Sequence, residues 1–69
     1  MGKSSTQRTR IKDKINSINT HLDYCLRYLR DIIETYRYYG YERIAQGLEG
    51  LAAQLIVIQQ LLKEFREKV

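Results

Sequence analysis

Cys25 and His21 carry the side chains best suited to covalent or metal chemistry, and they stand four residues apart. On a helix this spacing places them on one face, where the imidazole could take the proton of a thiol nucleophile. The chain holds one cysteine and one histidine, so the pair would supply only two of the four ligands of a structural zinc site. Cys25 also falls on an apolar repeat, where a cysteine packs as a small hydrophobic residue. We therefore expect Cys25 to pack rather than react, and we predict no metal site.

No other segment has the spacing of a catalytic motif. Gly2-Lys3-Ser4 matches the last residues of a phosphate-binding loop, but the first glycine of that loop and the strand before it are missing. Acidic residues occur singly on outward helix positions, and the Glu-x-x-His pattern of di-iron bundles does not occur. The sequence therefore predicts a protein that is not an enzyme and has neither a cofactor nor a small-molecule substrate.

The N-terminal end of the chain is basic. Among its first fourteen residues, Asp13 is the only acidic one, and the basic ones are Lys3, Arg8, Arg10, Lys12 and Lys14. Five positive charges minus one give +4, which is the formal charge of the whole chain. Cations in the first turns of a helix oppose its dipole at a cost of about 0.3–1 kcal/mol each, so helix stability does not explain them.

Attraction to the phosphates of DNA or RNA does explain this concentration of charge. We predict that the five basic residues form a nucleic-acid-binding site. Two alternatives stay open: the cations pair with Glu64 and Glu67 near the other end of the chain, or they contact an acidic protein or lipid.

Residues 1–6 also match the Met-Gly-x-x-x-Ser/Thr pattern for N-myristoylation, with Gly2 as acceptor and Thr6 as the last residue of the pattern. The basic residues that follow are the second signal that such an anchor requires. A myristoylated membrane-surface protein is thus a third alternative. Against it, the polar face of the second half of the chain carries glutamine where lipid-binding helices carry lysine and arginine, so no membrane partner is expected.

Two hydrophobic repeats run through the chain and meet at Gly40. The first consists of Ile11, Ile15, Ile18, Leu22, Cys25, Leu29, Ile32, Tyr36 and Tyr39, and the second of Ile44, Leu48, Leu51, Leu55, Ile58, Leu62, Phe65 and Val69. Both alternate steps of four and three, which is the coiled-coil period. The step from Tyr39 to Ile44 is five residues and breaks that period.

We therefore predict an all-α, antiparallel two-helix hairpin. Its expected parts are a flexible basic arm at 1–8, a first helix over about 9–38, a turn at 39–41 and a second helix over about 42–68. Gly40 is expected to adopt the left-handed conformation that closes a helix, with Tyr41 folding back on Tyr36.

A hairpin of this size buries little surface and needs further stabilisation, and one cysteine cannot form an internal disulfide. The chain has more apolar residues than one contact between two helices needs. This excess predicts that the hairpin dimerises into a four-helix bundle, with a larger oligomer or a different partner as alternatives. The predicted oligomer interface comprises Leu26, Ile33, Ala45, Ala52, Leu55, Ile56, Val57 and Leu61.

Aromatic residues gather at the expected turn, next to two arginines. Tyr38, Tyr39, Tyr41, Arg37 and Arg43 have the composition of a protein contact surface, and we predict a partner surface there. The rings could instead stack on bases or close the end of a narrow bundle.

Together these features predict a small, non-enzymatic, self-associating hairpin that acts as a nucleic-acid-binding or regulatory adaptor. The alternative is a structural or protein-interaction module, such as a viral or plasmid-borne assembly subunit, that uses the aliphatic residues of the second helix. The unpaired cysteine and the lack of a signal peptide predict a cytoplasmic location. The plan is similar to that of small plasmid-encoded helical hairpins that bind RNA and dimerise into four-helix bundles, a likeness of architecture alone.

Overall fold

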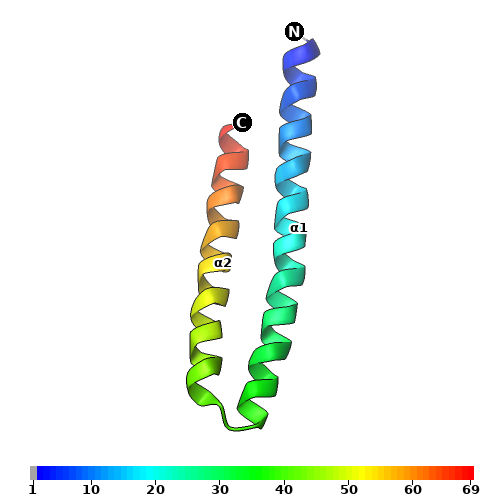
Figure 1. Ribbon diagram of the computed structural model, residues 1–69. Helices are drawn as coiled ribbons and strands as arrows, with labels where there is room; N and C mark the ends of the chain where they lie inside the picture. The colour runs from blue at the N-terminus through cyan, green and yellow to red at the C-terminus, as the bar shows by residue number, and fades with distance from the viewer. Residues whose placement is uncertain (1) are drawn as a thin grey trace.

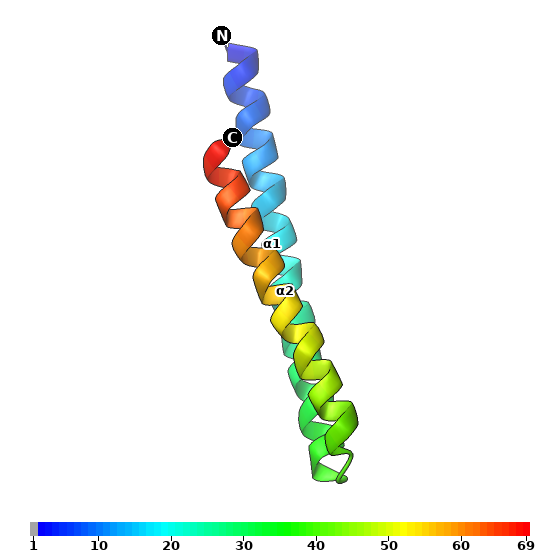
Figure 2. The same cartoon turned by 90° about the vertical axis from the view of Figure 1, so that its left-hand side faces the viewer.

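The protein is a hairpin of two packed helices, α1 (Gly2–Tyr38) and α2 (Glu42–Lys68). This computed structural model describes the backbone of residues 2–69 and the side chains of residues 7–69. The helices run antiparallel along their whole shared length (Figures 1 and 2), and the principal extents are 58 × 15 × 9 Å. The predicted all-α hairpin is confirmed.

α1 begins at Gly2 rather than near residue 9, so residues 2–8 continue the helix where the sequence predicted an arm. The chain contains no proline, and no glycine lies between Gly2 and Gly40. A helix that is nucleated farther along can therefore propagate back without meeting a residue that breaks it. As a result, the N-terminal turns of α1 project beyond the C-terminus of α2 (Figure 1).

The turn has the geometry predicted around Gly40. Gly40 has a φ of 85°, in the left-handed region that residues with a Cβ avoid. The Tyr41 N–H donates to the Tyr36 carbonyl at 2.8 Å, and the Gly40 N–H donates to the Arg37 carbonyl at 3.0 Å. These two bonds form a Schellman motif, which satisfies carbonyls at the end of α1 that lack a partner within the helix. The Tyr41 ring meets the Tyr36 ring edge-on at 6.0 Å, as the sequence predicted.

The contact between the helices, here called the seam, is displaced from the predicted one. It consists of the buried and half-buried positions Lys12, Ile15, Asn19, Leu22, Leu26, Leu29, Ile33 and Tyr36 of α1, and Ala45, Leu48, Ala52, Leu55, Gln59, Leu62, Arg66 and Val69 of α2. Every second residue of each predicted repeat lies here, among them Leu22 and Leu55. The residues between them in the predicted repeats, such as Ile18 and Leu51, are exposed instead, so this part of the prediction is wrong.

The composition of the seam changes along its length. At the turn, Ala45 is 0% exposed, because its small side chain lets the helices approach closely. At mid-length the Gln59 side-chain amide donates from Nε2 to the Asn19 carbonyl at 3.1 Å and to Asp23 Oδ1 at 2.8 Å. Towards the chain ends the seam contains Lys12 and Arg66. Only Ile15, Ile33 and Ala45 are buried among the described apolar residues, so the hairpin alone has a very small core.

Candidate interaction surfaces

The end of the hairpin opposite the turn, here called the open end, has a strong excess of positive charge. It comprises residues 8–14 of α1 and 63–68 of α2, which lie side by side because the helices are antiparallel. Its basic residues are Arg8, Arg10, Lys12, Lys14, Lys63, Arg66 and Lys68, and its acidic ones are Asp13, Glu64 and Glu67. Seven positive charges minus three give a net charge of +4. The structure thus brings four predicted nucleic-acid-binding residues together with three cations of α2, while the side chain of Lys3 lies outside those described.

The cations of the open end form no salt bridge with any other side chain that the structure describes. Among the side chains of residues 7–69, both salt bridges involve Arg37 at the turn, and neither Glu64 nor Glu67 forms one. The alternative in which these two glutamates pair with the basic N-terminus therefore has no ion pair to support it in the described part of the chain. Five of the seven cations, Arg8, Arg10, Lys14, Lys63 and Lys68, are exposed to solvent.

Two of these cations face each other across the seam. The Gln59–Asn19 contact sets the register of the two helices, and one heptad farther towards the open end Arg66 lies opposite Lys12. Both side chains are half-buried, and the Arg66 Nε is buried without a hydrogen-bond partner among the described residues. Like charges in one layer repel, and a partly desolvated cation gains from an anion brought close to it. This layer adds to the attraction of the open end for anions.

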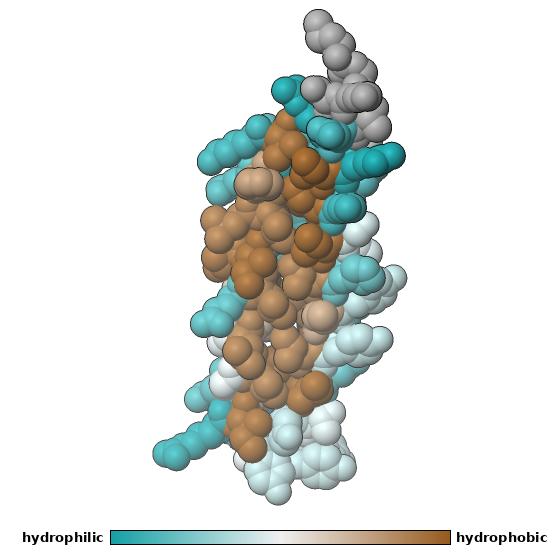
Figure 3. Space-filling model, turned by 45° about the horizontal axis from the view of Figure 1, so that its top comes forward, coloured by the Kyte–Doolittle hydropathy of each residue, from teal (hydrophilic) through white to brown (hydrophobic). Residues whose placement is uncertain are grey.

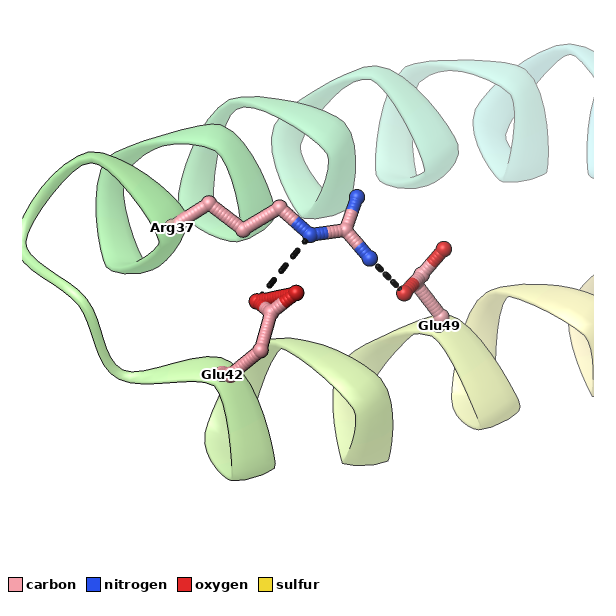
Figure 4. Close-up of polar contacts among 3 residues, drawn as sticks. All are labelled: Arg37, Glu42 and Glu49. Carbon is pink, nitrogen blue, oxygen red and sulfur yellow. Dashed lines mark hydrogen bonds and ion pairs between the residues drawn. The ribbon is translucent and has the colours of Figure 1, made fainter.

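At the other end, Arg37 bridges the two helices. Its guanidinium donates from Nε to Glu42 at 3.4 Å and from Nη2 to Glu49, as Figure 4 shows. The Arg37 side chain is 44% exposed, so this network is worth little to stability. Arg37 was predicted for a partner surface, and its ion pairs here are with the hairpin's own α2; Arg37 and Arg43 are both exposed.

The tyrosines predicted for a partner surface are exposed at the turn. Tyr38 is 84% exposed and Tyr39 is 68% exposed, and their rings meet edge-on at 5.2 Å. Tyr41 is exposed beside the half-buried Tyr36. Three of these four rings thus contact solvent and do not close the end of the hairpin. Together they form an aromatic surface with little net charge at the end opposite the cations.

A continuous apolar face covers one side of the hairpin (Figure 3). We use the name apolar face for Ile11, Ile18, Cys25, Ile32, Ile44, Leu51, Ile58 and Phe65, all of which are exposed. In each helix these residues recur every seven positions and directly precede a seam residue, as Ile32 precedes Ile33. Both helices are right-handed, but because they are antiparallel their residue numbers advance in opposite rotational directions when the hairpin is viewed from one end. The two rows therefore lie on the same side of the seam. Sequence reasoning found these residues but assigned them to the seam.

The residues predicted for the oligomer interface fall into three groups. Leu26, Ile33, Ala45, Ala52 and Leu55 lie in the seam of the hairpin itself and contact the other helix of the same chain. Leu61 borders the apolar face and is 57% exposed, while Ile56 and Val57 lie away from it. Ile56 instead lines an open groove of about 450 Å³ on the opposite side, which it shares with Arg30, Arg37 and Glu49 among others.

The candidate reactive residues form no site in the described part of the chain. Cys25 and His21 are both exposed. No group of three or more His, Cys, Asp or Glu side chains among the described residues is placed to hold a metal ion. Neither described helix has an apolar stretch long enough to cross a membrane. In the myristoylation pattern, Gly2 lies in α1, Met1 is outside the described residues, and the side chains of the rest are not described.

Comparisons with protein-family models, with curated proteins and with solved structures find no match to this chain.

Proposed function

We propose that the chain is a non-enzymatic, self-associating helical adaptor that binds nucleic acid through its open end. The observation that carries the proposal is the net charge of +4 on residues 8–14 and 63–68, without an ion pair among them. Nucleic acid gains more than other partners from such a cluster, because each phosphate that is neutralised releases a condensed counterion.

The shape of the open end suits a phosphate backbone. Arg8 and Arg10 are exposed on α1 beside the last turn of α2, and α1 continues past them to Gly2, so a groove or a single strand can approach this part of the hairpin. Apart from its three acidic residues, the polar residues of the open end are arginines, lysines and Thr9, which can donate to phosphate and sugar oxygens. We therefore propose binding with little sequence preference, to DNA or RNA.

A salt titration of binding tests this proposal. Fluorescence anisotropy with a labelled 20-base-pair duplex is expected to show affinity that falls as salt rises, with a log–log slope of about −0.9 for each phosphate contacted. The double variant Arg8→Gln/Arg10→Gln is expected to weaken binding and to make the slope shallower by about 2. Arg27→Gln/Arg43→Gln removes the same charge away from the open end and is the matched control. Equal losses in both variants, or no binding at low salt, would contradict a site at the open end.

A structural or protein-interaction module is the second candidate. The observation in its favour is the exposure of Ile56, Val57 and Leu61, at 48%, 56% and 57%, together with the apolar face. Persistent self-association in a chain that shows no affinity for duplex or single-stranded nucleic acid at low salt would favour this candidate over the first.

A further inference from the structure

The hairpin exposes more surface than a compact chain of its size. Its accessible surface is 5903 Å², whereas a compact folded monomer of 8.2 kDa exposes about 4,500 Å². The difference of about 1,400 Å² exceeds the roughly 800 Å² that each partner contributes to a standard protein interface. The chain therefore has enough spare surface to form a stable dimer without unfolding.

The most apolar part of this surface is the apolar face. Its residues include Ile18, 45% exposed, and Ile58, 44% exposed, at mid-length, and it extends to Phe65, 55% exposed, at the open end. The seam, in contrast, contains Asn19, Gln59, Lys12 and Arg66. The exposed rows are uniformly apolar, whereas several polar side chains pack between the two helices. The main hydrophobic core of the protein therefore forms only when another surface covers the apolar face.

We propose that a second copy of this chain covers the apolar face, giving a four-helix bundle in which the two turns lie at opposite ends. This inference rests on the proposed self-association and names the surface and the orientation. A second copy fits because both helices supply rows of the same period and length, so the face presents matching layers to its own two-fold mate. In this bundle each helix buries three of its seven heptad positions, as is usual for helices in bundles.

The orientation follows from charge. The open end has a net charge of +4, whereas residues 23–49, which include the turn, carry four basic and five acidic residues and a net charge of −1. Hairpins with their turns together would place two open ends side by side, and the like charges would repel. With the turns at opposite ends, each open end lies beside the mildly acidic turn half of the other copy.

The position of Gly47 supports packing of a second copy against this side of the hairpin. It lies four residues before Leu51 and three after Ile44, at the edge of the apolar face, and a Cβ added there would meet nothing within 4 Å in the hairpin. Packing between α1 and α2 therefore does not explain a glycine at this helical position. A second copy packed on the apolar face can approach the backbone closely there.

The first test is a matched pair of substitutions measured by analytical ultracentrifugation. The unmodified protein is expected at twice 8.2 kDa. Ile58→Gln, on the apolar face, is expected to raise the dimer dissociation constant by about 100-fold. Its neighbour Val57, 56% exposed against 44% for Ile58, points away from the face, and Val57→Gln is expected to change the dissociation constant less than about 3-fold. A monomeric unmodified protein would overturn both the self-association and this inference, whereas a dimer that responds equally to both variants would overturn the face alone.

The unmodified protein supplies a check that needs no substitution. Cys25 is the only thiol and belongs to the apolar face. Its reaction with a water-soluble thiol reagent is expected to slow at least 10-fold as the concentration rises from below to above the dissociation constant. A rate independent of concentration would overturn docking on this face.

The second test measures orientation. A spin label is attached to the variant Tyr38→Cys, in which Cys25→Ser removes the native thiol. The labelled position is at the turn, where Tyr38 is 84% exposed in the hairpin. With the turns at opposite ends, pulsed electron paramagnetic resonance is expected to give a distance of about 50 Å between the two labels, from a rise of 1.5 Å per residue. Turns at the same end would bring the labels within about 20 Å, since neighbouring helices lie about 8–10 Å apart. The shorter separation would overturn the proposed orientation.

Discussion

Gly50 lies inside α2 and is expected to weaken the helix without compensation. A Cβ added there meets nothing within 4 Å, so replacement by alanine creates no clash and removes no contact. Glycine in a helix interior is about 1 kcal/mol less favourable than alanine, because it loses more backbone freedom on folding. Gly50→Ala should therefore raise the free energy of unfolding by about 1 kcal/mol.

The assay is thermal unfolding followed by circular dichroism at one fixed protein concentration, since association makes the midpoint depend on concentration. For a domain of this size, 1 kcal/mol corresponds to a rise of about 4–8 °C in Tm.

Gly40→Ala is the control with the opposite sign. It places a Cβ at a φ of 85° and is expected to lower stability by about 1–2 kcal/mol, although the space around it is equally open. An unchanged or lower Tm for Gly50→Ala would refute the reasoning, because it would mean that Gly50 has a contact beyond the hairpin.

Two further substitutions test the seam. Ala45→Leu inserts a larger side chain at a position that is 0% exposed and should destabilise the hairpin by about 1–3 kcal/mol in a urea titration, whereas Ala53→Leu, at an exposed position, should have little effect. Equal effects would contradict close packing at Ala45. Gln59→Ala removes the two hydrogen bonds to α1 and should cost about 1 kcal/mol, against a few tenths for the exposed Gln60→Ala. A cost no larger than that of Gln60→Ala would show that the amide contact contributes nothing net.

The turn could be predicted because its causes are local. Gly40 is the residue that tolerates a positive φ, and the five-residue step between Tyr39 and Ile44 excludes a continuous heptad. The start of α1 could not be predicted, because the polar residues 3–8, which include neither proline nor glycine, carry no strong signal for either helix or coil. The charge of the N-terminal segment could be read directly, and the contribution of Lys63, Arg66 and Lys68 to the same end followed from the predicted antiparallel pairing.

The sequence by itself determined two helices, their meeting point at Gly40 and a stripe of apolar residues too wide for one partner. The tertiary structure decided how that stripe is divided. A heptad pattern with three apolar positions offers two adjacent seams, and periodicity is the same for both, so it cannot tell which one the hairpin uses. Packing distinguishes the two seams, because the one that contains Ala45 and Ala52 lets the helices approach closely near the tight turn. That choice placed Lys12 and Arg66 between the helices and left Ile18, Leu51 and the rest of the apolar face exposed.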